Sequence, residues 1–128
     1  MKKLALALGA LILIGGGCVP QRPSAEEEVK ATMENKDVVV IEMTSDGFSP
    51  PASTIKAGTT VKFVNKDTVP RWPASGMHPT HQLCPGFDSR NGIAPGESYV
   101  FTFNEAKTCP MHDHLNPRMR GSITVEGE

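Results

Sequence analysis

The pattern of apolar and polar positions in residues 38–126 predicts short strands joined by turns. Residues 97–104 give the clearest pattern, because Tyr99, Phe101 and Phe103 alternate with smaller side chains, as expected of a half-buried strand. The chain also contains 12 Gly and 11 Pro, many of which separate the apolar runs and indicate turns. We therefore predict an all-β sandwich of about seven strands. The better-defined strands are expected at residues 38–44, 53–56, 60–65, 97–104, 109–114 and 122–126.

Residues 69–94 do not fit this pattern of short strands and turns. They contain four prolines and the only Trp of the chain. A loop of this length within a compact domain is usually either functional or disordered. Trp72, Leu83 and Phe87 argue against disorder, since such side chains favour burial. We predict an ordered loop that carries function, with Trp72 packed beneath it.

The first eighteen residues have the features of an export signal. Lys2 and Lys3 precede an apolar run that is too short to span a bilayer stably, and three glycines then lead to Cys18. A cysteine at this point resembles a bacterial lipoprotein cleavage site, at which the cysteine is lipidated. A soluble exported protein and an uncleaved anchor are the alternatives. We predict a signal over residues 1–18, a flexible tether over 19–36 and one domain over 37–128.

The charge balance limits the possible partners. Two of the 13 basic side chains lie in the signal and none of the 14 acidic ones, so the exported chain has a net charge near −3. A nucleic-acid surface requires a basic patch, and we predict no nucleic-acid partner. The signal predicts a location in the cell envelope, either lipid-anchored at the membrane or periplasmic or extracellular.

Two cysteines remain after the signal is set aside. In an oxidising compartment, an even pair such as Cys84 and Cys109 is by default a disulfide. Such a bond would attach the long loop to the strand at residues 109–114. There are two alternatives: a cysteine thiolate could bind copper, or both cysteines could be free thiols.

The four histidines form two tight pairs, which predicts a metal site. His112 and His114 would share one face of an extended strand, whereas the spacing of His78 and His81 suits a turn. A His-x-His pair also arises by chance, so the prediction depends on both pairs meeting in space. Four imidazoles would suit Cu(II) and, less selectively, Zn(II).

Two further residues are candidate members of this site. Asp113 could bind the metal or orient one of its ligands, although hydrogen bonds to loop amides are an equal alternative. Met119 could supply a weak sulfur contact that favours Cu(I).

The order of several motifs resembles the cupredoxins, a family of small Greek-key sandwiches that bind copper. The resemblance implies a Greek-key β-sandwich over nearly the whole domain. It is carried by the segments DGFSP (46–50), KAGTTVKFVNKD (56–67), APGES (94–98), FTF (101–103) and MRGSITV (119–125).

The same resemblance implies that the usual blue-copper ligands are missing. Aligned with the family's His-Cys-His-Met set, this chain has Arg71, Asp113, Asn116 and Met119, of which only Met119 matches. Blue-copper sites depend on a Cys thiolate held beside two imidazoles. We therefore predict no ordinary blue-copper site.

Three functions are compatible with these observations. The first is a copper-binding protein of the cell envelope that stores or delivers the metal through its histidines. The second is a periplasmic electron-transfer cupredoxin, and the third is a metal-free, lipid-anchored interaction module. The expected partners are a metal ion, the membrane, and a redox or copper-handling protein whose identity the sequence does not give. No nucleophile–base pair stands out, so we do not predict an enzyme.

Overall fold

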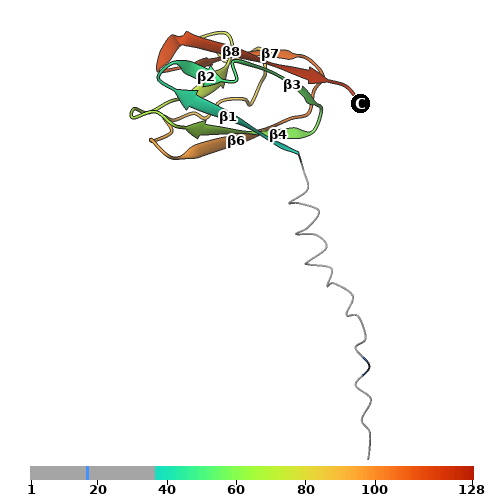
Figure 1. The fold of residues 1–128 in the computed structure, drawn as a ribbon. Helices are drawn as coiled ribbons and strands as arrows, with labels where there is room; N and C mark the ends of the chain where they lie inside the picture. The colour runs from blue at the N-terminus through green and yellow to red at the C-terminus, as the bar shows by residue number, and fades with distance from the viewer. Residues whose placement is uncertain (1–16, 18–36) are drawn as a thin grey trace, which may run out of the picture.

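The computed structural model describes Gly17 and residues 37–128. Residues 37–128 form two four-stranded sheets packed face to face, with no helix among them (Figure 1). The predicted all-β sandwich is therefore confirmed. The signal and tether predictions, including lipidation of Cys18, lie outside the described residues.

Eight strands make up the two sheets, and their bounds are as follows: β1 Val38–Thr44, β2 Gly47–Ser49, β3 Ala52–Lys56, β4 Thr59–Asn65, β5 Pro73–Ser75, β6 Ser98–Phe103, β7 Thr108–Asp113 and β8 Asn116–Glu126. One sheet has the strand order β2-β1-β4-β6 and the other β3-β8-β7-β5. The chain changes sheet between β2 and β3 and again between β3 and β4. As a result, β1 pairs in parallel with β4, and β3 pairs in parallel with β8.

The last strand is longer than predicted. We expected the last strand over residues 122–126, yet β8 begins at Asn116. Along β8 only residues 122–126 pair with β3, and residues 117–119 have no partner on β7 either. Proline lacks an N–H and is tolerated at such an unpaired edge. Two very short strands, β2 and β5, also escaped prediction.

The core lies between the sheets and includes an aromatic cluster. Phe63 on β4 stacks on Phe87 with a ring-centroid distance of 5.2 Å, and Phe87 meets Phe103 of β6 edge-on at 5.1 Å. Phe87 comes from the long segment between β4 and β6 and is completely buried. The core therefore holds this segment in place, in agreement with the prediction that it is ordered.

The long segment is also attached directly to β7. Cys84 and Cys109 form the predicted disulfide, with their Cα atoms 5.8 Å apart. Beside it, the Gly76 amide donates to the Pro110 carbonyl at 2.7 Å, and the Ser75 amide to the Phe87 carbonyl at 2.8 Å. These links place residues 76–84 against the strand that carries His112.

No helix of the described residues is long and apolar enough to cross a membrane.

Replacing both Cys84 and Cys109 by Ala is expected to lower the free energy of unfolding by about 3 kcal/mol, because the disulfide closes a loop of 25 residues in the unfolded chain. Denaturant unfolding of the full chain, with and without a reductant, measures this loss. A variant as stable as the oxidised parent would show that the bond does not hold the long segment.

Candidate metal centre

Four imidazoles meet at one end of the sandwich. One ring nitrogen from each of His78, His81, His112 and His114 lies within 4.8 Å of the other three. His112 lies on β7 and is 4% exposed, while His78 is exposed at the rim and the other two rings are half-buried. The two pairs that the sequence singled out therefore lie together in space.

The four rings contact one another in two pairs across the site. His78 Nδ1 lies 3.3 Å from His112 Nε2, and His81 Nε2 lies 3.0 Å from His114 Nδ1. A metal with four nitrogen ligands at about 2.0–2.1 Å sets neighbouring nitrogens roughly 3.3 Å apart in a tetrahedron. The present spacing therefore fits a single ion after small rotations of the rings.

The backbone brings the strand pair together differently from the prediction. His112 is the second-last residue of β7, but His114 lies in the two-residue turn between β7 and β8. The register between these strands shifts between His112 and Asp113, and the His114 amide donates to the Trp72 carbonyl at 2.8 Å. A bulge and a turn, rather than one face of a regular strand, therefore direct both rings into the site.

A tight turn presents the loop pair. The His81 amide donates to the Met77 carbonyl at 2.8 Å, and His81 adopts a left-handed φ of 54°. Few non-glycine residues adopt this conformation, although His, Asn and Asp do so more readily than most. The turn thus places the His81 ring inward at a small cost in backbone energy.

Asp88 orients His81 and was missed by the sequence analysis. Its Oδ2 accepts a hydrogen bond from His81 Nδ1 at 2.8 Å, which leaves His81 Nε2 directed at the other imidazoles. A carboxylate bound to the far nitrogen of a ligand histidine is the usual support of a metal site. The available signal was an acidic residue seven positions after His81 in the same long segment.

Asp88 also fixes Trp72. Its Oδ1 accepts from Trp72 Nε1 at 2.6 Å, and the indole ring packs on His114 with centroids 4.4 Å apart. Burial alone would raise the pKa of the Asp88 carboxyl, but hydrogen bonds, first from His81 and then from Trp72, lower it below its usual value. Trp72 thus packs against the site, which extends the packing role expected for it.

The two strand-pair imidazoles are poor bases in this setting. Burial, followed by the neighbouring His81 and His78, lowers the pKa of His112 to about 4. The same causes lower the pKa of His114. Both rings are therefore neutral near pH 7, and neutral imidazole is the form that binds a metal.

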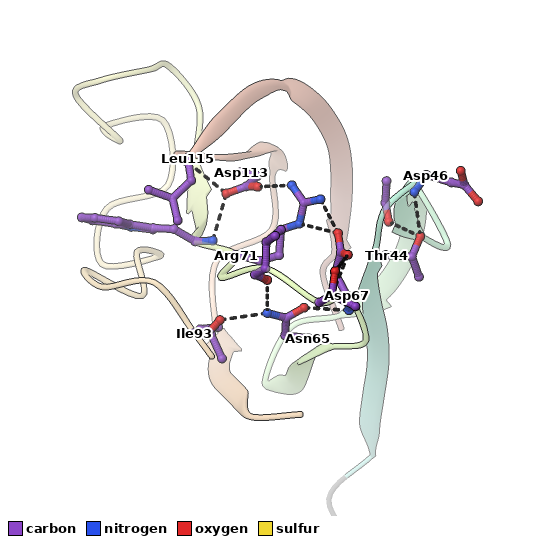
Figure 2. A network of polar contacts seen from close by, with 12 residues as sticks. Thr44, Asp46, Asn65, Asp67, Arg71, Ile93, Asp113 and Leu115 are labelled. Carbon is purple, nitrogen blue, oxygen red and sulfur yellow. Dashed lines mark hydrogen bonds and ion pairs between the residues drawn. The ribbon is translucent and has the colours of Figure 1, made fainter. Parts of the chain in front are cut away.

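Arg71 and Asp113, the residue between His112 and His114 in the chain, form a buried ion pair (Figure 2). Arg71 Nη1 lies 2.8 Å from Asp113 Oδ2, and Arg71 also pairs with Asp67 through Nη2 and, at 3.1 Å, through Nε. Asn65 holds the backbone at Asp67 in place: its Oδ1 accepts from the Asp67 amide at 2.9 Å, and its Nδ2 donates to Ile93 O at 2.8 Å. The hydrogen bond from Arg71 is the main cause that lowers the pKa of Asp67.

Asp113 has no free oxygen for a metal. While Oδ2 takes Arg71, Oδ1 accepts from the amides of Trp72 at 2.9 Å and Leu115 at 3.0 Å. This is the alternative role, hydrogen bonding to loop amides, and the structure does not group Asp113 with the four imidazoles. Met119 is buried in the hydrophobic core, and its sulfur contact with the metal stays a prediction. Of these two candidate ligands, Asp113 is thus engaged by its own hydrogen bonds.

Comparisons with known proteins agree on the fold. A family model described as a cupredoxin-like domain matches residues 10–125. Amicyanin from Paracoccus versutus is 31% identical over 105 residues, covering 80% of this chain and 76% of amicyanin. The chain therefore belongs to the cupredoxin-like family, as the sequence resemblance indicated.

Solved structures show the same architecture. A purple cupredoxin from Nitrosopumilus maritimus superposes with a TM-score of 0.61 at 23% identity, covering 69% of this chain and 99% of that protein. A Cu(I) structure of an amicyanin variant gives a TM-score of 0.60 at 23% identity, covering 70% and 82% of the two chains.

The Arg71–Asp113 pair can be tested by removing one charge. The Asp113→Asn variant leaves the Arg71 cation paired with Asp67 but without its fully buried partner, so the free energy of unfolding should fall by about 1–3 kcal/mol. Lys107→Gln breaks an exposed pair with Glu105 and should cost about 0.5 kcal/mol at most. Urea unfolding of the metal-free full chain measures both, and equal losses would contradict the structural role of the buried pair.

The lowered histidine pKa values predict acid sensitivity of the metal-free protein. Between pH 6.5 and 4 the unfolded chain binds protons that folded His112 does not, so stability is complete above pH 6.5 and declines below it. The decline should reach up to about 3 kcal/mol at pH 4. Denaturant unfolding measured at a series of pH values, with a metal chelator present, should show that the stability of His112→Gln depends less on pH than that of the parent. A parent profile without slope in this range would contradict the shift.

Proposed function

We propose that this protein binds copper in the cell envelope through His78, His81, His112 and His114, and that it stores or delivers the metal. The convergence of the four ring nitrogens within 4.8 Å, on a domain of the cupredoxin-like family, carries this proposal. All four donors are neutral nitrogens when deprotonated, which is a set that suits Cu(II) and also accepts Zn(II).

Copper is preferred to zinc on two grounds. Affinities of nitrogen sites for divalent first-row metals peak at Cu(II), so a site without a strong geometric preference takes copper first. The names of the similar structures also include copper: amicyanin variants are described there in their Cu(I) form. Zinc remains the natural competitor for a tetrahedral arrangement of four imidazoles.

Storage or delivery is preferred to electron transfer because the site lacks sulfur from cysteine. Cys84 and Cys109 are bonded to each other, so neither sulfur is a thiolate available to a metal. Without that short, covalent bond, a four-imidazole site changes its geometry more between Cu(I) and Cu(II), which slows electron exchange. Electron transfer is the second candidate, because amicyanin is among the relatives.

The rest of the chain suggests where the protein works. We infer that residues 1–18 direct export, that Cys18 carries a lipid anchor, and that residues 19–36 connect this anchor to the domain. The partners would then be the membrane, the metal ion and a redox or copper-handling protein. We propose a binding protein rather than an enzyme, since no nucleophile–base pair stands out beside the imidazoles within residues 37–128.

Titration of the purified full chain with Cu(II) and Zn(II) tests the proposal. We expect one Cu(II) per chain, with a paramagnetic resonance spectrum of tetragonal nitrogen coordination and no intense thiolate-to-copper absorption. An intense thiolate band would favour electron transfer and overturn the ligand set. Binding of neither metal would leave the interaction module.

Single substitutions assign the ligands. His78→Ala alters an exposed ring and should lower the Cu(II) affinity at least tenfold without a change in fold, and the double variant of His112 and His114 to Ala should abolish the nitrogen spectrum. Asn116→Ala is the matched control, because this exposed residue aligns with a family ligand but lies outside the imidazole group. Circular dichroism confirms that each variant is folded. A loss of binding in the Asn116 variant, or none in the histidine variants, would contradict the assignment.

A further inference from the structure

A pocket of about 420 Å³ opens directly beside two of the four imidazoles. His78 and His112 form one part of its wall, and the rest is mainly apolar. Met77 and Met111 also line the pocket. This pocket therefore gives a ligand from solvent access to the edge of the imidazole group.

Met77 contributes an exposed thioether sulfur to this pocket. Its side chain is 66% exposed, whereas Met111, which also lines the pocket, is 2% exposed and packed in the core. The Met77 thioether is therefore open to a ligand from solvent, whereas the Met111 sulfur is not. A thioether is also flexible and can reach several positions around its Cα atom.

The backbone holds Met77 firmly even though its side chain is exposed. The Met77 carbonyl accepts from the His81 amide at 2.8 Å and from Thr80 Oγ1 at 3.3 Å. The same turn therefore fixes Met77, His78 and His81 relative to one another. A mobile thioether is presented at the mouth of the pocket, adjacent in the chain to one imidazole of the group.

The thioether of Met77 and the imidazole of His78 differ in the metal ions that they prefer. A thioether is a soft ligand that selects Cu(I) and binds Zn(II) or Cu(II) weakly, while imidazole accepts all three ions. Both sulfur atoms of the disulfide are unavailable as thiolates. Within the described residues, Met77 is thus the accessible sulfur next to the imidazole group.

We propose that Met77 and His78 form a capture site for Cu(I) at the mouth of the pocket, from which the ion passes to the four imidazoles. This inference rests on the proposed copper function and adds the oxidation state in which the metal arrives. The transfer exchanges neutral ligands only: a Cu(I)–thioether bond breaks, a Cu(I)–imidazole bond forms, and no electron or proton moves. Two exposed ligands bind more weakly than four converging ones, so the ion moves inward.

The rate of Cu(I) loading tests this proposal. The full chain, held under anaerobic conditions, is mixed with the Cu(I) complex of a chromophoric chelator, and the loss of chelator colour gives the rate. Met77→Leu keeps the apolar volume and removes only the sulfur, so loading should slow at least fivefold. Loading of Zn(II) from a coloured zinc complex should be unchanged in the same variant.

Met43→Leu is the matched control, since it removes the sulfur of a completely buried methionine on β1 of the other sheet. It should load Cu(I) at the parental rate. Equal Cu(I) rates for the parent and the Met77 variant would overturn the capture site and leave the proposed function intact. Equal slowing of Cu(I) and Zn(II) would also overturn it, because shape and not sulfur would then be responsible. A parent chain that takes up neither metal would overturn both proposals.

Discussion

The buried pair of Arg71 and Asp113 is the interaction on which the rest of this end of the molecule depends. It joins the start of the long segment to the last residue of β7, and the same carboxylate accepts the amides of Trp72 and Leu115. One side chain thereby fixes the strand end, the turn after it and the approach of the long segment. The cost of burying two charges is offset because all of their hydrogen-bonding groups have partners: no buried side-chain nitrogen or oxygen of the described residues lacks one.

This pair explains why the imidazoles and not the family's usual positions form the candidate centre. By the sequence resemblance, Arg71 and Asp113 occupy places where blue-copper relatives have a histidine and a cysteine, and here these two residues neutralise each other. His112 and His114 flank Asp113 along the chain, and the strand register shifts between His112 and Asp113. The disulfide and the burial of Phe87 then bring the loop pair to the same place. The domain is therefore tied together without a metal, and the imidazoles remain available to bind one.

Much of this arrangement could be predicted from the sequence. Alternation of apolar residues located β6, β-branched runs located β1 and β4, and the even pair of cysteines predicted the disulfide. The convergence of the histidines followed from the expectation that this bond links the two segments that carry them. Two local features differ from the prediction. β8 begins at Asn116, since Pro117 is tolerated on an edge without a partner strand, and His114 lies in a turn instead of on the strand. Asp113 was a candidate ligand because the sequence does not show that both of its oxygens accept hydrogen bonds, from Arg71 and from two loop amides. Asp88 was missed because a single acidic residue in a long loop has no distinguishing pattern.

X-ray absorption at the copper edge of the full chain, loaded with one equivalent of Cu(II), is the sharpest test of binding by the four imidazoles. We expect nitrogen ligands only, at about 2.0 Å from the copper, with the outer-shell scattering that imidazole rings produce. The same measurement on the double variant of His112 and His114 to Ala should lose that pattern. A short copper–sulfur distance in the parent, or a first shell of oxygen without imidazole scattering, would contradict it.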